Sequence, residues 1–456
     1  MSSLSPTGSA SPLGRPVELL QRLIRFDTTN PPGHERECIS YIGQLLTDAG
    51  FEISLLGRSP DRPNLVARLK GRGDSPPLLL HGHADVVPAA EQDWEHPPFE
   101  GAIVDGYVWG RGALDMKGGI AMMLSALSRA KLEGLSLPGD VLLVLLSDEE
   151  AGSFNGARYL VENHPELFEG VRYAIGEFGG FSFPISGRRF YPIMVAEKHP
   201  CVLRAKVRGA SGHGALSGRG SAVSRLAHLL RRLERQPLPV HVTPVARQTF
   251  SSVASSLPFP ARMVFRLLVN PAMTARIIWL LGDRGKLFAP LFRNTANVTM
   301  IRGGDQINVI PSEVEIGLDC RLLPGYGPAH IIAELRAIIG GDVELEVVHY
   351  DPGPAEPDMG LFGTLSAVLR QADPEGVPVP MLLPAATDGR FFSRLGIQSY
   401  GFLPMRLPPD FAFYETIHGV NERVPVDALA FGAEVIYQLL QRFGEGGSGP
   451  WPLSPS

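Results

Sequence analysis

Cysteines, long apolar runs and basic charge are all scarce in this sequence. The 456 residues include only three cysteines, Cys38, Cys201 and Cys320, and no CxxC spacing occurs. Three cysteines cannot all pair, so neither a disulfide framework nor a thiolate zinc site is supported. We therefore expect a reducing compartment, the cytoplasm, for this protein.

Membrane spans and nucleic-acid binding are disfavoured on similar grounds. No apolar stretch reaches the roughly 20 residues of a membrane-spanning helix, and the nearest, Ile277 to Leu281, is cut short by Asp283 and Arg284. The 42 lysines and arginines are outnumbered by 47 aspartates and glutamates, which leaves a net charge of −5. Because the chain has no basic excess, we expect small-molecule partners and neither nucleic acid nor a membrane.

The two ends of the chain differ in composition from its middle. Residues 1–15 are small and polar without the apolar run of a signal peptide, and residues 446–456 are rich in glycine, serine and proline. We expect a flexible leader and a flexible tail there. The chain between them is long enough for two or more domains.

Helix and strand signals alternate in the first half of the chain. Apolar runs at Leu78–Leu80, Val141–Leu146 and Tyr173–Ile175 predict strands buried on both faces. An amphipathic segment, Gly118–Ala130, predicts a helix between two of them. This alternation indicates an α/β fold with a mostly parallel sheet. We expect this catalytic domain to comprise residues 16–197 and 352–445.

Residues 198–351 have a different order of elements and predict an inserted α+β domain. An apolar helical stretch, residues 237–293, interrupts it. The other elements form the order β-α-β-β-α-β, which is the ferredoxin-like split unit. They are expected at Val202–Val207, Ala222–Leu233, Asn297–Ile301, Val314–Leu318, Ala329–Ile339 and Val343–Val348.

Four segments place acidic residues or a histidine after an apolar strand or before a glycine-rich turn. Ligands bind beyond the carboxyl ends of strands in open parallel sheets, so these side chains should cluster there. Clustered carboxylates repel one another unless a cation offsets their charge. We therefore predict a divalent-metal site of imidazole and carboxylate ligands, suited to Zn²⁺, with Mn²⁺ or Co²⁺ as substitutes. The segments are LLLHGHADVVP with His83 and Asp85, GRGALDMKGG with Asp115, LLVLLSDEEAGS with Glu149 and Glu150, and YAIGEFGG with Glu177; His418 in ETIHGVNERVPV is the best further ligand.

Each segment taken alone has a simpler interpretation. A single histidine at a strand end is more often structural, and an Asp-Glu-Glu run is usually a solvated loop. Asp115 could simply cap the helix that follows it. The coincidence of all these segments within one hundred residues favours the metal site.

The same segments resemble the dizinc amidohydrolases and metallopeptidases that include aminoacylase, acetylornithine deacetylase, succinyl-diaminopimelate desuccinylase and the glutamate carboxypeptidases. GHADVVP, DGYVWGRGALDMKGG, SDEEAGS, NVIP followed by DCR, and TDGR occur in the family's order, and LIRFDTTNPPG is also similar. The resemblance covers nearly the whole chain except the leader, the tail and residues 237–293. It implies a catalytic domain of the zinc-exopeptidase type, an inserted lid and dimerisation domain, and a homodimer.

The resemblance also implies a role for each residue of the predicted site. Asp115 would bridge two zinc ions, and the peptide bond after it is commonly cis in the family. Asp85 would orient His83, and Glu149 would be the general base. The implied reaction is hydrolysis of the amide bond of an N-acyl-amino acid or small peptide with a free carboxylate, by a hydroxide that bridges the two metals. The implied metal ligands are His83, Asp115, Glu150, Glu177 and His418, with Glu177 beside His83 and Glu150 beside His418.

Further residues resemble recognition groups of the family. His213 in GASGHGALSG resembles a histidine that reaches across a dimer to the oxyanion, although it could be an ordinary residue of a glycine-rich loop. Asn308 and Arg321 resemble residues that hold the substrate carboxylate, and Arg321 could instead form a structural salt bridge. Asp388 and Arg390 in TDGR resemble family residues to which we assign no role.

Three questions stay open at this level. An N-deacylase and a carboxypeptidase or dipeptidase need the same metal site and carboxylate clamp, so the residues do not separate them. A metal-binding relative without catalysis is a further alternative, against which the intact Glu149 argues. The apolar stretch 237–293 could enlarge a dimer surface or line a hydrophobic substrate pocket, and we favour the packing role.

Overall fold

The computed structural model describes residues 11–90, 93–216 and 219–445. The predicted tail and residues 1–10 of the predicted leader lie outside this part. Pro12–Gly14 form a short 3-10 helix, η1, in which Leu13 is buried, so this end of the expected flexible leader is folded. Contacts divide the chain into two compact units. Unit 1 comprises Met1–Val195, Asp358–Val379 and Thr387–Ser456, and unit 2 comprises Ala196–Pro357 and Pro380–Ala386.

The large sheet has the strand order β1-β2-β6-β3-β7-β17-β9-β16, with β8 paired to β9. Its centre, β6-β3-β7-β17, is parallel as expected. The β1/β2, β2/β6 and β17/β9 pairs are antiparallel, so the chain reverses toward both edges. The strands are β1 (Glu52–Leu56), β2 (Asn64–Leu69), β3 (Leu78–His83), β6 (Val141–Leu146), β7 (Tyr173–Gly176), β8 (Phe183–Ile185), β9 (Arg188–Glu197), β16 (Val377–Leu383) and β17 (Gln398–Gly401).

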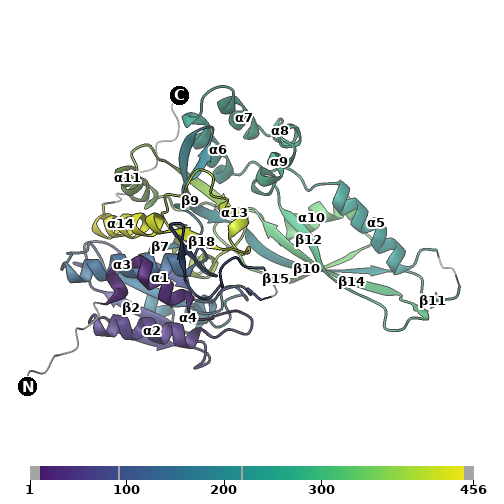
Figure 1. The fold of residues 1–456 in the computed structure, drawn as a ribbon. Helices are drawn as coiled ribbons and strands as arrows, with labels where there is room; N and C mark the ends of the chain where they lie inside the picture. The colour runs from purple at the N-terminus through teal and green to yellow at the C-terminus, as the bar shows by residue number, and fades with distance from the viewer. Residues whose placement is uncertain (1–10, 91–92, 217–218, 446–456) are drawn as a thin grey trace, which may run out of the picture. The chain divides into compact units, whose positions relative to one another are not determined.

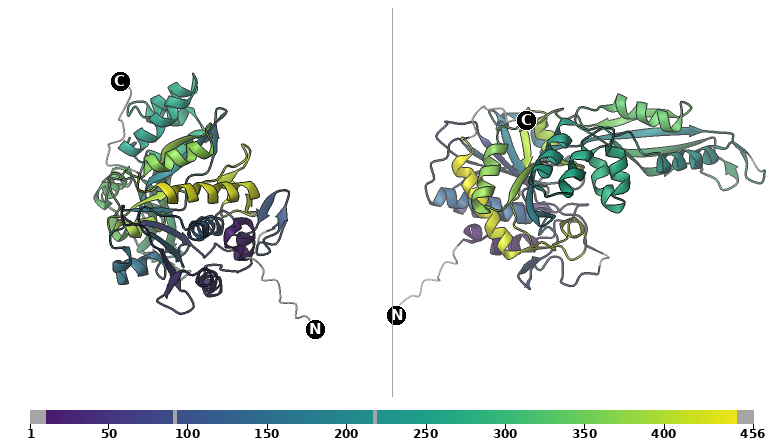
Figure 2. Two further views of the ribbon diagram at one scale, coloured as in Figure 1. Left: turned by 90° about the vertical axis from the view of Figure 1, so that its left-hand side faces the viewer. Right: turned by 90° about the horizontal axis from the view of Figure 1, so that it is seen from above.

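Helices cover both faces of this sheet in unit 1 (Figure 2, left). The central strands β3 and β6 are consequently buried at every position, which explains their uninterrupted apolar sequence. A small sheet, β18-β5-β4, lies apart from the large one. The helices are α1 (Pro16–Ile24), α2 (Glu35–Asp48), α3 (Lys117–Leu132), α4 (Ala157–Asn163), η2 (Pro165–Phe168), α11 (Phe362–Ala372), α12 (Gly389–Ser393), α13 (Phe413–Thr416) and α14 (Val426–Arg442), and the short strands are β4 (Ile103–Val104), β5 (Tyr107–Trp109) and β18 (Arg423–Pro425).

Unit 2 contains an antiparallel sheet with the order β12-β14-β10-β15. Two helices, α5 and α10, pack against this sheet (Figure 1). This order and the sequence β-α-β-β-α-β confirm the predicted ferredoxin-like unit. A two-stranded ribbon, β11 (Gly212–His213) with β13 (Val309–Ile310), extends it. The main elements are β10 (His199–Arg208), α5 (Ala222–Arg235), β12 (Thr295–Arg302), β14 (Glu313–Leu322), α10 (Pro328–Ile339) and β15 (Glu344–Tyr350).

The three cysteines are free and buried. Cys201 on β10 and Cys320 on β14 are direct register partners across the sheet. Their 119-residue separation in the sequence gave no sign of this proximity, because strand register is decided by tertiary pairing.

The apolar stretch 237–293 is helical, as predicted. Its helices enclose a cluster of aromatic rings around Phe250, whose centroid lies 5.8 Å from that of Phe265, 5.6 Å from Phe288 and 4.8 Å from Phe292. In the described residues, no helix combines the length and the hydropathy that a membrane span requires. The helices are α6 (Pro244–Ser256), α7 (Ala261–Leu268), α8 (Thr274–Leu280), α9 (Asp283–Phe288) and η3 (Ala289–Leu291).

The central strand β6 provides a test of this fold. Leu143→Ala would leave a cavity between strands that are covered on both faces, so the free energy of unfolding should fall by about 2–5 kcal/mol. Leu132→Ala, at a position 79% exposed at the end of α3, should change it by less than about 0.5 kcal/mol. Urea denaturation followed by circular dichroism compares the two variants. Equal losses would show that β6 is not in the core.

Candidate metal centre

A single carboxylate, that of Asp115, lies between two imidazoles. Its Oδ1 is 3.0 Å from Nε2 of His83, and its Oδ2 is 3.0 Å from Nε2 of His418. His83 ends the central strand β3, Asp115 precedes α3, and His418 lies in the loop before β18. The peptide bond between Asp115 and Met116 is cis, as the resemblance implied. The fold thus brings together two histidines that are 335 positions apart in the chain.

Each imidazole also faces a glutamate of its own. Oε2 of Glu177, just after β7, is 3.2 Å from Nε2 of His83. Oε1 of Glu150, in the turn after β6, is 3.3 Å from Nε2 of His418. The arrangement therefore has two halves that share Asp115, with Glu177 beside His83 in one and Glu150 beside His418 in the other.

Asp85 connects His83 with the turn that carries the two adjacent glutamates. Its two carboxylate oxygens accept hydrogen bonds from the backbone N–H groups of Glu149 and Glu150, at 3.1 and 3.0 Å. Nδ1 of His83 lies 3.0 Å from the Asp85 carbonyl oxygen and 3.4 Å from its Oδ1. Burial opposes ionisation of Asp85, but hydrogen bonds from His83 and Asn30 outweigh it and hold the pKa of Asp85 below its usual value. Asp85 is thus an anionic anchor for both halves.

A second anchor lies behind the same turn. Asp148 has a positive φ of 73°, which is uncommon for a residue other than glycine. Its carboxylate accepts hydrogen bonds from Asn155 and is paired with Arg62 at 3.0 Å. The Asn30 amide donates to both Asp85 and Asp148, at 2.8 and 3.1 Å. Our reading of the sequence missed Asn30, although it belongs to the segment LIRFDTTNPPG that carries the resemblance.

The carboxylates of the centre would carry more negative charge than two protonated histidines could neutralise. Burial and the neighbouring Glu177 raise the pKa of Glu149 well above its usual value. Burial and the charge of Asp115 raise the pKa of Glu177 to about 8. Hydrogen bonds to Asp115 and Glu150 raise the pKa of His418 to about 10. This excess of negative charge is what a bound cation would offset.

The donor atoms also fit a divalent metal. Ligand atoms of His83, Asp115 and Glu150 lie within 4.8 Å of one another, and so do those of His83, Glu149 and Glu177. Oε1 of Glu150 is buried, and Nε2 of His418 lies 3.3 Å from it. Imidazole nitrogens and carboxylate oxygens are ligands that zinc takes in proteins, so the set has the donor chemistry of a metal centre.

A buried ion pair, Glu422 with Arg111, holds the loop on which Asp115 lies. Both side chains are at most 1% exposed, and Nη1 of Arg111 is 2.7 Å from Oε2 of Glu422. Nη2 of Arg111 donates to the carbonyl oxygen of His418 at 3.3 Å. The pair therefore ties together the segments that carry Asp115 and His418, and our reading of the sequence missed it. The Glu422 carboxylate also accepts the backbone N–H groups of Gly112, Leu114 and Asp115, at 3.0, 2.8 and 3.1 Å.

The TDGR motif lies close to these carboxylates. Asp388 is buried and accepts a hydrogen bond from the Ser153 hydroxyl. Burial raises the pKa of Asp388 to about 6, although Arg390 opposes this rise. Arg390 donates to the Thr387 carbonyl oxygen at 2.8 Å, so the motif is bound within its own turn.

The remaining predicted residues belong to unit 2, whereas the residues of the metal centre belong to unit 1. His213 on β11 is exposed, and its Nδ1 accepts the Ala215 N–H at 3.2 Å. Asn308 is exposed as well. Arg321 forms a two-pronged ion pair with Asp319, at 3.0 and 3.2 Å. The structure thus contains the salt bridge that was the alternative for Arg321, with a residue of its own strand.

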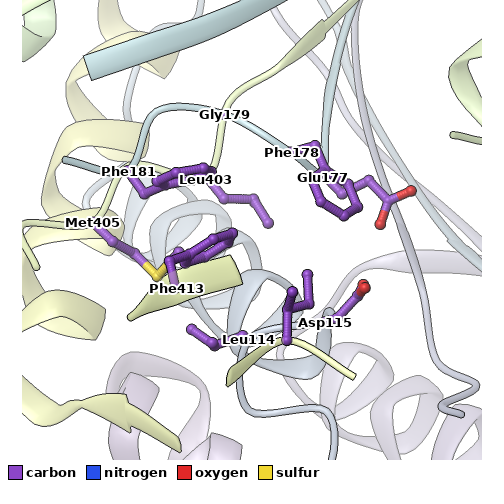
Figure 3. Close-up of a pocket in the computed structure, with 10 residues that line it drawn as sticks. Leu114, Asp115, Glu177, Phe178, Gly179, Phe181, Leu403, Met405 and Phe413 are labelled. Carbon is purple, nitrogen blue, oxygen red and sulfur yellow. The ribbon is translucent and has the colours of Figure 1, made fainter. Parts of the chain in front are cut away.

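An apolar pocket adjoins the centre. Figure 3 shows Asp115 and Glu177, with Phe178 beside Glu177, on one side, and Phe181, Met405 and Phe413 on the other. The rings of Phe181 and Phe413 are stacked in its wall, with centroids 3.9 Å apart. The pocket is lined by Leu114, Asp115, Glu177, Phe178, Gly179, Phe181, Leu403, Met405, Phe413 and Ile417.

Known proteins are similar to this chain in sequence and in fold. The chain is 30% identical over 380 residues to N-fatty-acyl-amino acid synthase/hydrolase PM20D1 of Homo sapiens, which covers 80% of this chain and 74% of that protein. It is 25% identical over 436 residues to Aminoacylase-1 of Homo sapiens, with coverage of 93% and 94%. The structure of human carnosine dipeptidase 1 shares the fold, with a TM-score of 0.67 and 16% identity over 95% of this chain and 97% of that chain.

The family model of Peptidase family M20/M25/M40 matches residues 79–442. This span includes His83, Asp115 and His418, and it also includes the whole inserted unit. The chain therefore belongs to Peptidase family M20/M25/M40 and is a metal-dependent hydrolase of that family.

Proposed function

We propose that this protein is a two-zinc amidohydrolase that cleaves the amide bond of an N-acyl-amino acid bearing a free carboxylate. The position of Asp115 between His83 and His418, with one oxygen toward each imidazole, carries this proposal. A carboxylate placed in this way suits a bridge between two cations. Glu177 and Glu150 would complete the two halves, and Mn²⁺ or Co²⁺ could replace zinc.

The chemistry requires an activated water and a base. Two divalent cations, when bound, polarise the amide carbonyl and increase the acidity of water. Glu149 would accept the proton of the attacking water and later donate it to the leaving nitrogen. The backbone N–H of Glu149 donates to the Asp85 carboxylate. This contact would position the base and leave the Glu149 carboxylate available for the proton.

Two observations support N-acyl-amino acids over peptides. PM20D1 and Aminoacylase-1, the relatives described above, are named for acyl-amino acids and together match most of the chain. The pocket beside Asp115 and Glu177 is lined mainly by apolar side chains, so an apolar substituent next to the amide bond would meet an apolar surface there. A carboxypeptidase or dipeptidase activity is the alternative, because it would use the same metal centre.

We further propose that unit 2 is the lid and dimerisation domain of a homodimer. In this arrangement His213 of one subunit would reach the oxyanion in its partner's site, and Asn308 and Arg321 would hold the substrate carboxylate. In this role the Arg321 guanidinium would contact both the substrate carboxylate and Asp319. A cytoplasmic location remains a prediction, and the three buried free thiols are compatible with it.

The proposed activity is tested by metal content together with a substrate panel. The purified protein should contain two zinc ions per chain, lose its turnover after treatment with a chelator, and regain it with Zn²⁺, Mn²⁺ or Co²⁺. N-acyl-amino acids with short and long acyl chains should be cleaved faster than dipeptides. Faster cleavage of dipeptides would support the alternative, and full turnover by the metal-free protein would contradict the proposal.

Glu149→Gln separates the base from the metal ligands. This change keeps the shape of the side chain but removes its ability to accept a proton, so kcat should fall by about 10²–10⁴-fold. Metal content should remain at two per chain. Unchanged turnover would show that Glu149 is not the base, whereas a loss of metal would show that it is a ligand.

Glu422→Gln tests the buried ion pair. An amide group at this position would direct its NH₂ toward backbone N–H groups or Arg111, so the Asp115 loop should shift and metal affinity should fall by about 10–100-fold. Competition with a chromogenic chelator measures the affinity, and the absorption spectrum of the Co²⁺ form reports the ligand geometry.

Glu375→Gln, at a side chain 85% exposed, is the matched control for Glu422→Gln and should bind metal like the unmodified protein. Thermal unfolding of both variants checks that each remains folded. An unaltered metal affinity and Co²⁺ spectrum in folded Glu422→Gln would refute the positioning role.

A further inference from the structure

The helical segment of unit 2 has a charge opposite to that of the rest of the chain. Between Pro244 and Leu291 the sequence has six basic residues and one acidic residue, Asp283. This segment therefore carries +5, whereas the remainder of the chain carries −10. The net charge of −5 conceals this separation. The basic residues are Arg247, Arg262, Arg266, Arg276, Arg284 and Lys286.

The same segment exposes large apolar side chains. Trp279 and Leu280 at the end of α8 are 79% and 68% exposed, and Leu287 on α9 is 71% exposed. Phe259, just before α7, is 79% exposed, and Met263 on α7 is 47% exposed. Five exposed large apolar residues thus occur within 29 positions. Such clusters of exposed apolar residues commonly mark interaction sites.

On α7, α8 and α9, exposed residues such as Met263, Trp279 and Leu287 occur beside buried ones. The inner sides pack on the aromatic cluster, to which Phe265 of α7 and Phe288 of α9 contribute, with centroids 5.9 Å apart. On α8, Ile277 is buried, whereas Arg276 and Trp279 are exposed. Each helix thus presents basic and apolar side chains away from its own core. Figure 1 shows α7, α8 and α9 grouped together.

The combination of charge and exposed apolar groups selects the partner. Amphipathic helices with Trp, Phe and Leu on one side and Lys or Arg around them are typical of membrane interfaces. A two-fold contact between copies would place +5 against +5, which opposes association. An anionic lipid surface offers both the opposite charge and an apolar layer for the side chains.

We propose that the segment Pro244–Leu291, with Trp279, Leu280 and Leu287 inserted between lipids, binds the surface of anionic membranes. This proposal replaces our expectation from the sequence that the protein has no membrane partner, which rested on the net charge and on the absence of a span. It also replaces the dimer surface and the substrate pocket that we considered for residues 237–293. Because it concerns a surface of unit 2, it does not depend on the activity of the metal centre.

Co-sedimentation of the full-length protein with lipid vesicles tests the proposal. The protein should bind vesicles that contain phosphatidylglycerol more tightly than vesicles of phosphatidylcholine alone, and added salt should weaken this binding. The triple variant Trp279→Ser, Leu280→Ser, Leu287→Ser should reduce the partition coefficient by about tenfold or more. Leu132→Ser, on α3 of unit 1 and 79% exposed, should bind like the unmodified protein.

A second pair of variants tests the charge. Replacing Arg262, Arg266 and Arg276 by glutamine should reduce binding to the anionic vesicles by about tenfold or more, since each basic residue near such a surface contributes to affinity. Replacing Arg225 and Arg231 by glutamine, at exposed positions of α5 in the same unit, should have little effect. Quenching of tryptophan fluorescence by brominated lipids should disappear in Trp279→Phe.

Three results would overturn the proposal. The first is absence of binding to either kind of vesicle. The second is that the triple serine variant and the triple glutamine variant of Arg262, Arg266 and Arg276 both bind vesicles as tightly as the unmodified protein. The third is a change from dimer to monomer in the triple serine variant, seen by sedimentation velocity without any change in vesicle binding, which would assign the patch to a second copy of the chain.

Discussion

Repulsion among carboxylates is the constraint on which the centre of this protein depends. Asp115, Glu149, Glu150 and Glu177 converge on His83 and His418, and the imidazoles do not balance their charge. Burial, together with the neighbouring carboxylates, raises the pKa values of Glu149 and Glu177. A structure that gathers such groups must hold them rigidly until a cation stabilises them. The central strands provide this rigidity, because β3 and β6 are buried on both faces and deliver their acidic residues at fixed ends.

Two buried carboxylates that are not among the proposed metal ligands hold the backbone beside those ligands. Asp85 accepts the backbone N–H groups of Glu149 and Glu150. Glu422 does the same for Leu114 and Asp115. In both turns an acidic side chain fixes the backbone beside a candidate ligand, so that the ligand's own carboxylate stays available. Fixed outer groups of this kind commonly tune metal affinity, and here they come from segments far apart in the chain.

The sequence predicts features that depend on residues close together in the chain, and it misses features that depend on contacts between distant residues. Apolar runs such as Val141–Leu146 are local signals, and so are acidic residues at strand ends; both predicted the strands and the clustered residues well. The roles of Asn30 and Glu422 depend on contacts across 55 and 311 positions, which no local pattern contains. The ion pair of Arg321 with Asp319 joins residues only two positions apart, yet the sequence did not favour it over the proposed role toward a substrate.

The net charge of the whole chain is also a poor guide to the charge of one part of its surface. A value of −5 argued against anionic surfaces, yet it is the sum of a cationic helical segment and a more strongly anionic remainder. Screening confines the influence of each charge to roughly 8–10 Å at physiological ionic strength. A surface therefore responds to the residues that are near it and hardly to the rest of the chain. For Trp279 and its neighbours, the relevant charge is that of α7, α8 and α9, and this charge is positive.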